Sequence, residues 1–289
     1  MAIILGVAIA LGCMLGGFVH MGCKLETLLQ PSEYIVLLGS AFGSFIVANP
    51  LAVMKDTGKA LLQALKNDVP KEKQYIALLG VLYSLMREMR SKPSAEVERH
   101  VDDPKNSVIF QAHPAILKNT ILLNFICDYC RLILMGNARS FEVEALMDEE
   151  IETLVRDWQK PYHALQTVAD SLPALGIVAA VLGIINALSH INGSPEVLGE
   201  SIGSALVGTF AGVFCSYGVF GPIAMQVKTV RYKRSRVFVV VKQTLLAYMN
   251  GAMPQVALEY GRKTISDLYR PSIAVVEQEA VVNKAPATA

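Results

Sequence analysis

The sequence predicts an all-α integral membrane protein with four transmembrane helices. Hydrophobic residues make up 53% of the chain and its mean hydropathy is +0.41, values that favour a membrane protein over a soluble one. A helix needs roughly 20 apolar residues to cross about 30 Å of hydrocarbon, and four stretches meet or nearly meet that length. They run approximately over Ala2–Met21, Tyr34–Val53, Ser171–Leu188 and Ser201–Val227. None contains Asp, Glu, Lys or Arg, so the spans are predicted to carry no ion on an acid of their own.

The positions of these stretches predict four segments. Residues 1–54 would form a transmembrane hairpin of spans 1 and 2, and residues 168–227 a second hairpin of spans 3 and 4. Residues 55–167 would form a large helical cytoplasmic domain, and residues 228–289 a cytoplasmic C-terminal tail. No strand pattern occurs, so the expected fold is entirely helical.

The basic residues predict the orientation in the membrane. Of the 26 Lys and Arg residues, all except Lys24 lie between Lys55 and Lys160 or after Val227. Because cytoplasmic loops carry the excess of Lys and Arg, both termini and the central segment are expected in the cytoplasm. The basic run Lys228–Arg236 is interpreted as an anchor at anionic lipid headgroups rather than as a nucleic-acid site.

Helical patterns fill the predicted cytoplasmic parts. A basic amphipathic helix is expected first, then a helix interrupted at Pro93 and followed by a short charged stretch. A strongly apolar helix and an acidic helix come next, and the C-terminal end is expected to fray. The regions are Lys55–Lys73, Tyr75–Arg90, Ser94–Asp102, Asn119–Met135, Phe141–Val155 and Ile273–Ala289. The apolar helix contains Asp128 and Arg131 and is short for a span, so we interpret it as a buried core helix.

Small residues recur at every fourth position of the spans. Such stripes let helix backbones approach closely where lipid supplies no hydrophobic drive. The members are Ala8, Gly12 and Gly16; Gly39 and Gly43; Ala179, Gly183 and Ala187; and Ser204, Gly208, Gly212 and Ser216. The pattern predicts packing against other spans, within the chain or in neighbouring copies.

Two prolines are predicted to lie at a similar depth of the antiparallel third and fourth spans. Pro173 is near the cytoplasmic start of the third span, and Pro222 is near the cytoplasmic end of the fourth. Pro173 could be a helix-start residue that follows Asp170, and Pro222 could be an ordinary kink. Alternatively, the two prolines could form a hinge. The isolated hydroxyl of Thr209 is expected to bond a carbonyl of its own helix.

The sequence contains no constellation typical of an enzyme. It has no phosphate-cradling loop, no cluster of metal ligands and no pairing of a nucleophile with a base, so neither catalysis nor a cofactor is expected. Cys127 and Cys130 form a C-x-x-C without a second pair, and we interpret them as small, half-buried helix residues. An autonomous channel is disfavoured because the spans contain no acid.

Five segments carry a resemblance to a known family. They are FGSFIVANP (Phe42–Pro50), FEVEALMDEEIE (Phe141–Glu152), DSLPALGIVAAVLGI (Asp170–Ile184), LVGTFAGVFCSYG (Leu206–Gly218) and EYGRKT (Glu259–Thr264). Through them, nearly the whole chain resembles the MotA family of flagellar-motor stator subunits, within the wider MotA/TolQ/ExbB class of ion-driven proteins.

The resemblance implies a multi-pass protein of the bacterial inner membrane that conducts protons together with MotB, a single-span partner. That partner would supply an intramembrane aspartate and an anchor to peptidoglycan. Five copies of the chain would surround two partner helices in the lipid bilayer. Their cytoplasmic domains would push on the rotor protein FliG, with no role for nucleic acid.

The resemblance also implies roles for individual residues. Arg90 and Glu98, on either side of Pro93, match charged residues that face the rotor. Pro173 and Pro222 match prolines that undergo conformational change, which favours the hinge.

Three further residues, Ala180, Thr209 and Tyr217, match the lining of the ion path. Sodium-driven relatives place a threonine at the position of Ala180, where its oxygen can ligate a hard cation. A methyl group cannot ligate Na⁺, whereas a proton needs only the partner's carboxylate. The resemblance therefore implies proton drive.

A TolQ- or ExbB-like energiser of an outer-membrane process is the alternative function. Those relatives have three spans, with the large cytoplasmic part after the first. Here the large segment follows the second span, which favours the stator.

Overall fold

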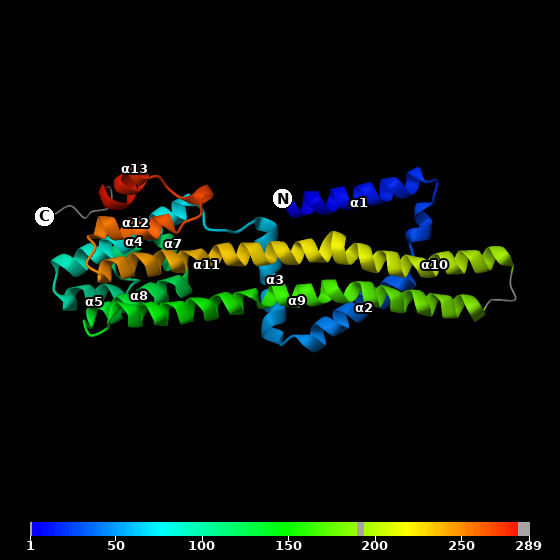
Figure 1. The fold of residues 1–289 in the computed structure, drawn as a ribbon, viewed down its shortest axis with the longest axis horizontal. Coiled ribbons are helices and arrows are strands. Elements are labelled where there is room, and N and C mark those ends of the chain that lie inside the picture. The colour runs from blue at the N-terminus through cyan, green and yellow to red at the C-terminus, as the bar shows by residue number, and fades with distance from the viewer. Residues whose placement is uncertain (1, 190–193, 283–289) are drawn as a thin grey trace. The chain divides into compact units, whose positions relative to one another are not determined.

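The computed structural model describes residues 2–189 and 194–282, and these parts are helical without any β-strand (Figure 1). The main helices are α1 (Ala2–His20), α2 (Pro31–Ala48), α3 (Leu51–Lys66), α4 (Glu72–Ser91), α5 (Ser94–Asp102), α8 (Thr120–Leu134), α9 (Ser140–Ser189), α10 (Pro195–Phe214), α11 (Gly221–Met249) and α12 (Pro254–Lys263). The short helices are η1 (Leu25–Leu28), α6 (Val108–Gln111), α7 (Pro114–Leu117), η2 (Cys215–Phe220), η3 (Asp267–Tyr269), α13 (Ile273–Val276) and η4 (Glu277–Val282). The all-helical fold class is confirmed.

The helices gather into two compact units. Unit 1 comprises Met1–Asp68 and Trp158–Arg231, and unit 2 comprises Val69–Asp157 and Tyr232–Ala289. Each unit joins two segments that are far apart in the sequence, and α9 and α11 contribute residues to both units. This division groups residues by contact, whereas the four predicted segments follow their order along the chain.

Four helical stretches are long and apolar enough to cross a membrane. They are Ile3–His20, Leu25–Ala48, Ser140–Ser189 and Pro195–Met249, and the last two continue beyond unit 1. Large apolar side chains on these helices are exposed, for example Ile35 at 72% and Val47 at 89%. Such a surface suits lipid rather than water. The prediction of four spans, with a large helical part between spans 2 and 3, is confirmed.

The second span ends earlier than the hydrophobic stretch Tyr34–Val53 predicts. That stretch crosses Pro50, and a proline ring disfavours the helical conformation of the residue before it. Asn49 accordingly adopts an extended conformation (φ −127°, ψ 131°), so α2 ends before it and α3 begins after Pro50. The amphipathic helix predicted over Lys55–Lys73 is α3, which begins earlier and ends at Lys66.

Span 3 belongs to a helix that continues far past the membrane stretch. α9 runs for 50 residues through Pro161 and Pro173 without a break. The interpretation of Pro173 as a helix-start residue is therefore wrong. A proline inside a helix removes one backbone hydrogen bond and favours a kink, so Pro173 remains a candidate for conformational change.

Span 4 passes from α10 through the π-helical η2 into α11. A π-helical turn departs from the regular hydrogen-bond ladder of an α-helix and often marks a functional position. Pro222 is the second residue of α11, directly after this turn. Because proline has no backbone N–H to donate, it is tolerated where the regular hydrogen-bond ladder is already disturbed. No sequence pattern predicted the π-helical turn.

The two prolines do not lie at the same depth. A Cβ added to Gly212 would lie 2.6 Å from the carbonyl oxygen of the residue before Pro173, so Pro173 is level with that part of α10. Ala224, shortly after Pro222, packs in one cluster with Leu165 instead. The prolines are therefore offset by about six to ten residues, or roughly 9–15 Å along the helices, and the prediction of a similar depth is wrong.

A partly buried ion pair holds α3 against α11 within unit 1. The Arg231 guanidinium, whose side chain is 8% exposed, lies 2.7 Å from Oδ1 of Asp56. Lys228, one turn earlier, lies over the ring of Tyr162 at 4.7 Å from its centroid. The basic run after the fourth span therefore makes specific protein contacts, in addition to any role at lipid headgroups.

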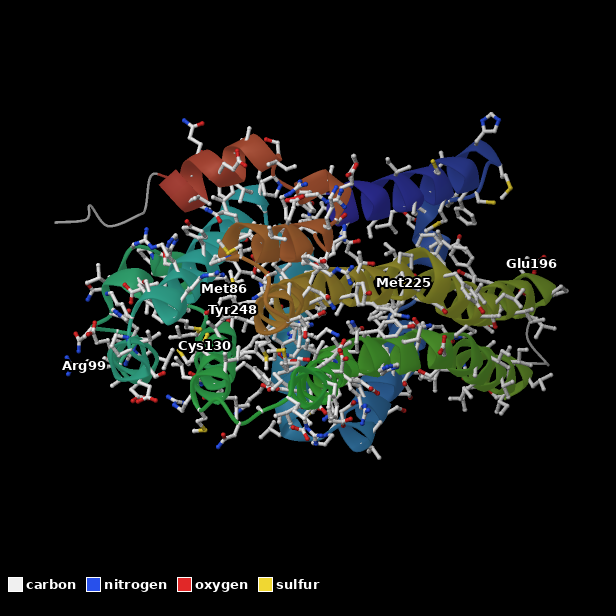
Figure 2. The ribbon with its side chains drawn as sticks, turned by 60° about the vertical axis from the view of Figure 1, so that its left-hand side comes forward. Met86, Arg99, Cys130, Glu196, Met225 and Tyr248 are labelled. Atoms are coloured by element: carbon white, nitrogen blue, oxygen red, sulfur yellow. The ribbon has the colours of Figure 1, made fainter. Side chains whose placement is uncertain are left out.

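Unit 2 has an apolar core to which α4, α8 and α11 contribute. Phe125 of α8 meets Phe238 of α11 edge-on, with 5.1 Å between the ring centroids. Met86, Cys130 and Tyr248, labelled in Figure 2, come one from each of these helices, and the first two are fully buried. α8 is the predicted apolar helix, and it is a core helix that is absent from the candidate spans of the described chain. This prediction is confirmed.

The acidic first part of α9 makes internal contacts within unit 2. The Lys242 ammonium of α11, 10% exposed, lies 2.8 and 3.0 Å from the two carboxylate oxygens of Asp148. Glu150 accepts a 2.8 Å hydrogen bond from the Tyr129 hydroxyl. Burial and this bond hold the pKa of the Tyr129 phenol well above its usual range. The charged face of this segment therefore serves domain packing.

The C-terminal end is ordered further than the sequence predicts. α13 and η4 pack against α4, and Val276 and Ala280 are buried there. The predicted fraying of Ile273–Ala289 is therefore wrong as far as Val282, and the remaining residues lie outside the described part.

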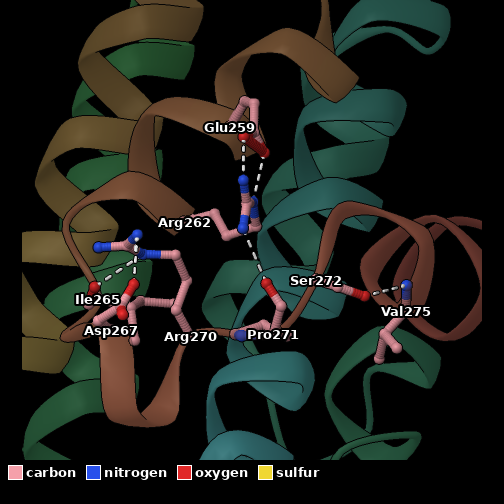
Figure 3. A network of polar contacts seen from close by, with 8 residues as sticks. All are labelled: Glu259, Arg262, Ile265, Asp267, Arg270, Pro271, Ser272 and Val275. Atoms are coloured by element: carbon pink, nitrogen blue, oxygen red, sulfur yellow. Dashed lines mark hydrogen bonds and ion pairs between the residues drawn. The ribbon is translucent and has the colours of Figure 1, made fainter.

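A polar network holds α12 and the chain that follows it (Figure 3). Arg262 donates to both carboxylate oxygens of Glu259 at 2.5 Å and to the Pro271 carbonyl at 2.8 Å. The Arg262 guanidinium holds the pKa of the Glu259 carboxyl below its usual range. Gly261 lies so close to Thr244 of α11 that a side chain would not fit there. Packing within unit 2 therefore accounts for Glu259–Thr264, one of the five segments that carry the family resemblance.

Candidate functional site

α9 and α10 meet through glycines in the membrane part of unit 1. A Cβ added to Gly212 would lie 2.6 Å from the Leu172 oxygen, and one added to Gly176 would lie 2.8 Å from the Gly208 oxygen. Only glycine permits such an approach of two backbones. Ala179 is also fully buried. The close packing predicted for spans 3 and 4 therefore occurs within the chain.

The stripes of spans 1 and 2 are different. A Cβ added to Gly12, Gly16, Gly39 or Gly43 would meet nothing within 4 Å among the described residues. These faces of α1 and α2 are therefore left for lipid or for other protein chains.

Thr209 and Ala180 come together where α9 meets α10. The Thr209 hydroxyl donates a 3.4 Å hydrogen bond to the Gly176 carbonyl of α9, so the expected bond to its own helix is wrong. The close backbone contact brings this foreign carbonyl within reach. Ala180, one turn beyond Gly176, is 6% exposed and lies beside Gly208.

Tyr217 lies apart from this pair. It belongs to the π-helical η2, about two turns beyond Thr209, and it is 73% exposed. Pro222 is also exposed, and Pro173 is half-buried. Within one chain, therefore, only two of the three predicted ion-path residues are neighbours.

Sequence reasoning missed an acidic residue of this region. Hydropathy starts span 2 at Tyr34, but α2 begins at Pro31, so Glu33 lies in its first turn. Glu33 is only 7% exposed. The prediction that the spans carry no acid is therefore wrong for the helix of span 2. The signal was available, because proline favours the first position of a helix and would have placed Glu33 inside it.

Arg90 and Glu98 lie in unit 2 on either side of the break at Pro93, as the sequence predicts. Arg90 is exposed in the last turn of α4, and Glu98 is half-buried in α5. Neither forms an ion pair with another residue of the described chain. The charged stretch Ser94–Asp102 forms the helix α5.

A cluster of polar and charged side chains joins the two helices beside this break. The buried Glu88 carboxylate lies 3.0 Å from the Lys92 Nζ and 3.0 Å from the His100 Nε2. His100 Nδ1 lies 2.8 Å from the Ser107 hydroxyl. The cluster therefore holds α5 against the end of α4 and fixes the setting of Arg90 and Glu98.

The C-x-x-C is a packing feature. Cys127 and Cys130 are both buried in unit 2, and burial raises the pKa of the Cys127 thiol to about 12. Because the thiolate is the reactive form, neither residue is set up for redox chemistry near neutral pH. Of the residues that the structure describes, no group of His, Cys, Asp and Glu could hold a metal ion.

Comparisons with known proteins decide the family. The family model for the motility protein A N-terminal region matches residues 4–93, and that for the MotA/TolQ/ExbB proton channel family matches residues 117–236. Motility protein A of Escherichia coli K12 is 40% identical over 286 residues, which cover 99% of this chain and 97% of that protein. The chain belongs to the motility protein A family. It is thus a multi-pass membrane protein of a channel family, and not an enzyme.

Two solved MotAB structures share the fold. The C. jejuni MotAB structure matches with a TM-score of 0.74 at 19% identity, over 94% of this chain and 98% of that chain. The flagellar MotAB stator complex from Bacillus subtilis matches with a TM-score of 0.66 at 22% identity, over 89% and 92%. The matched family regions contain Pro173, Ala180, Thr209 and Pro222, whereas Glu98 lies between them.

Proposed function

We propose that this chain is the proton-driven stator subunit of a bacterial flagellar motor. It lies in the inner membrane with both termini in the cytoplasm, and with a MotB-like partner it converts proton flow into torque on FliG. The observation that carries this proposal is the 40% identity to Escherichia coli motility protein A over nearly the full length of both chains. The likeness in fold to two MotAB structures supports it.

The chemistry of the ion path calls for the partner. The residues proposed to line it, Ala180, Thr209 and Tyr217, offer a methyl group, a hydroxyl and a phenol, and none of them is a carboxylic acid. An intramembrane aspartate of the single-span partner supplies the central acid. Five copies of this chain around two partner helices form the wall, for which the exposed apolar faces of the spans offer ample contact surface.

Proton drive is proposed from Ala180. Its methyl group offers no oxygen to a sodium ion that has lost its water, whereas hard cations require oxygen ligands. A proton needs only the carboxylate of the partner. No cofactor other than the driving proton takes part.

The coupling is proposed to use both prolines. Protonation of the partner's aspartate changes how these chains pack around it, and Pro173 and Pro222 pass the change towards Arg90 and Glu98. Both prolines interrupt the hydrogen-bond ladder of helices that contribute residues to both units, which supports this route.

The energies are compatible with such a cycle. One elementary charge that crosses 100 mV releases about 2.3 kcal/mol. An exposed ion pair is worth roughly 0–1 kcal/mol. One proton can therefore break and remake one or two weak contacts between the rotor and the side chains of Arg90 and Glu98.

Rescue of motility tests the proposal. In a cell that lacks its own stator, this chain should restore swimming only when a MotB-like partner is co-expressed. Ion conduction by the chain alone would contradict the proposal. Rescue of an energised outer-membrane process in place of swimming would favour the TolQ- or ExbB-like alternative, against which the four candidate spans and the large segment after the second argue.

A further inference from the structure

The side chain of Glu33 crosses from α2 into the contact between α9 and α10. A Cβ added to Gly183 would lie 2.9 Å from Glu33 Oε1, and a Cβ added to Gly208 would lie 2.8 Å from Glu33 Oε2. The two glycines, one on each helix, therefore form a notch that admits the carboxyl group only because they have no side chains.

The notch provides few polar contacts to replace the water that the carboxyl group loses on burial. Ala179 and Ala205 line the glycines with methyl groups, and Glu33 Oε2 has no hydrogen-bond partner among the described residues. A buried carboxylate oxygen without a partner disfavours the ionised form, so this group favours binding a proton or another cation.

The carboxyl lies beside the residues assigned to the ion path. Gly208 immediately precedes Thr209, and Gly183 is one turn from Ala180. Glu33 follows the short loop between the first two spans, which the distribution of basic residues puts on the outer side of the membrane. The group thus lies between the outer side and the proposed path.

We propose that Glu33 is a proton-relay carboxyl on the outward part of the ion path, supplied by this chain in addition to the acid of the partner. Its carboxylate accepts a proton from water on the outer side and becomes a carboxylic acid. The O–H bond then breaks, the proton passes inwards to the partner's carboxylate, and the Glu33 carboxylate is restored. No electron is transferred. This inference rests on the proposed function and deepens it.

A relay and a purely structural hydrogen bond make different demands on the side chain. A relay needs a group that gains and loses a proton, which an amide cannot do. A structural role needs only the volume and the hydrogen-bonding capacity, which Gln retains. Glu33→Gln therefore separates the two roles, and Glu33→Asp tests whether a shorter carboxyl restores transport.

The experiment uses the full chain with its partner. Fluorescently tagged complexes are counted at the motors, and proton conduction per complex is measured along with motor speed at low load. Glu33→Gln should be recruited normally but lose about tenfold or more in proton conduction, and Glu33→Asp should recover part of it. Glu26→Gln, which changes an exposed carboxyl in η1, should conduct as the wild type does.

Two outcomes would overturn the inference. Wild-type conduction by Glu33→Gln would exclude a relay, and failure of Glu33→Gln to assemble with its partner would assign the residue to packing. Failure of the proposed function is distinguishable from both, because the wild-type chain with its partner would then not restore swimming at all.

Discussion

The predicted role of Ala180 depends on its small side chain, a single methyl group in a confined position. It is buried where α9 meets α10, beside Gly208. Threonine would add a hydroxyl and a further carbon, and overpacking of this kind costs about 1–3 kcal/mol. We predict that Ala180→Thr lowers swimming speed in sodium-free medium, measured by cell tracking, and that the smaller Ala180→Ser lowers it less. Identical swimming of Ala180→Thr and wild type under every ion condition would leave the role of this residue unsupported.

Arg90 and Glu98 carry the second prediction at the residue scale. Reversal of either charge, by Arg90→Glu or Glu98→Lys, should reduce torque while membrane insertion and partner binding persist, because a reversed charge repels its rotor contact. Torque is measured on tethered cells or beads. Arg99→Glu changes an exposed arginine of α5, seen in Figure 2, and should have little effect. Equal torque in all the variants would refute the rotor-facing assignment.

At the scale of elements, α9 offers a matched pair of prolines. Both Pro161 and Pro173 lie inside this one helix. Pro173→Ala restores a backbone donor and should straighten and stiffen the helix, which abolishes swimming while insertion and partner binding survive. Pro161→Ala should affect swimming much less. Loss of membrane insertion in Pro173→Ala would show that the residue serves folding instead.

The contact of α9 with α10 gives the second prediction at this scale. A methyl group at position 212 would lie 2.6 Å from the Leu172 oxygen and would force the helices apart. We predict that Gly212→Ala lowers the thermal unfolding temperature of the purified protein in detergent, with a cost of about 1–3 kcal/mol. Gly203→Ala, in the same helix with nothing within 4 Å, should leave that temperature unchanged or raise it. Equal unfolding temperatures for both variants would refute the tight contact.

At the scale of the whole molecule, the testable property is the orientation in the membrane. Cys23 is exposed in the loop between the first two spans, which is predicted to lie outside the cytoplasm. A membrane-impermeant thiol reagent added to spheroplasts should therefore label the wild type at Cys23, and Cys23→Ser should lose that label. Ser91→Cys, made in the Cys23→Ser chain, should be labelled only after permeabilisation. The reverse pattern would invert the proposed orientation.

Hydropathy, helical periodicity and charge distribution determined the four spans, the core helix α8 and the order of the segments, since these depend on composition over windows of many residues. The bounds of α2 and α9 were predictable only in part, because prolines act differently in the two helices. Pro50 ends α2, with Asn49 as its C-cap residue, whereas Pro173 lies inside α9.

Only the tertiary structure decided which groups meet. It brought Thr209 to a carbonyl of another helix, offset the two prolines and placed the Glu33 carboxyl between two glycines. These contacts join residues up to 175 positions apart, as between Asp56 and Arg231, so no local pattern encodes them. The sequence by itself determined a four-span helical protein whose four apolar stretches contain no acid. The tertiary structure added the Glu33 carboxyl, which packs between α9 and α10. Hydropathy misses this residue because α2 already begins at Pro31, where the hydropathy pattern still indicates a loop.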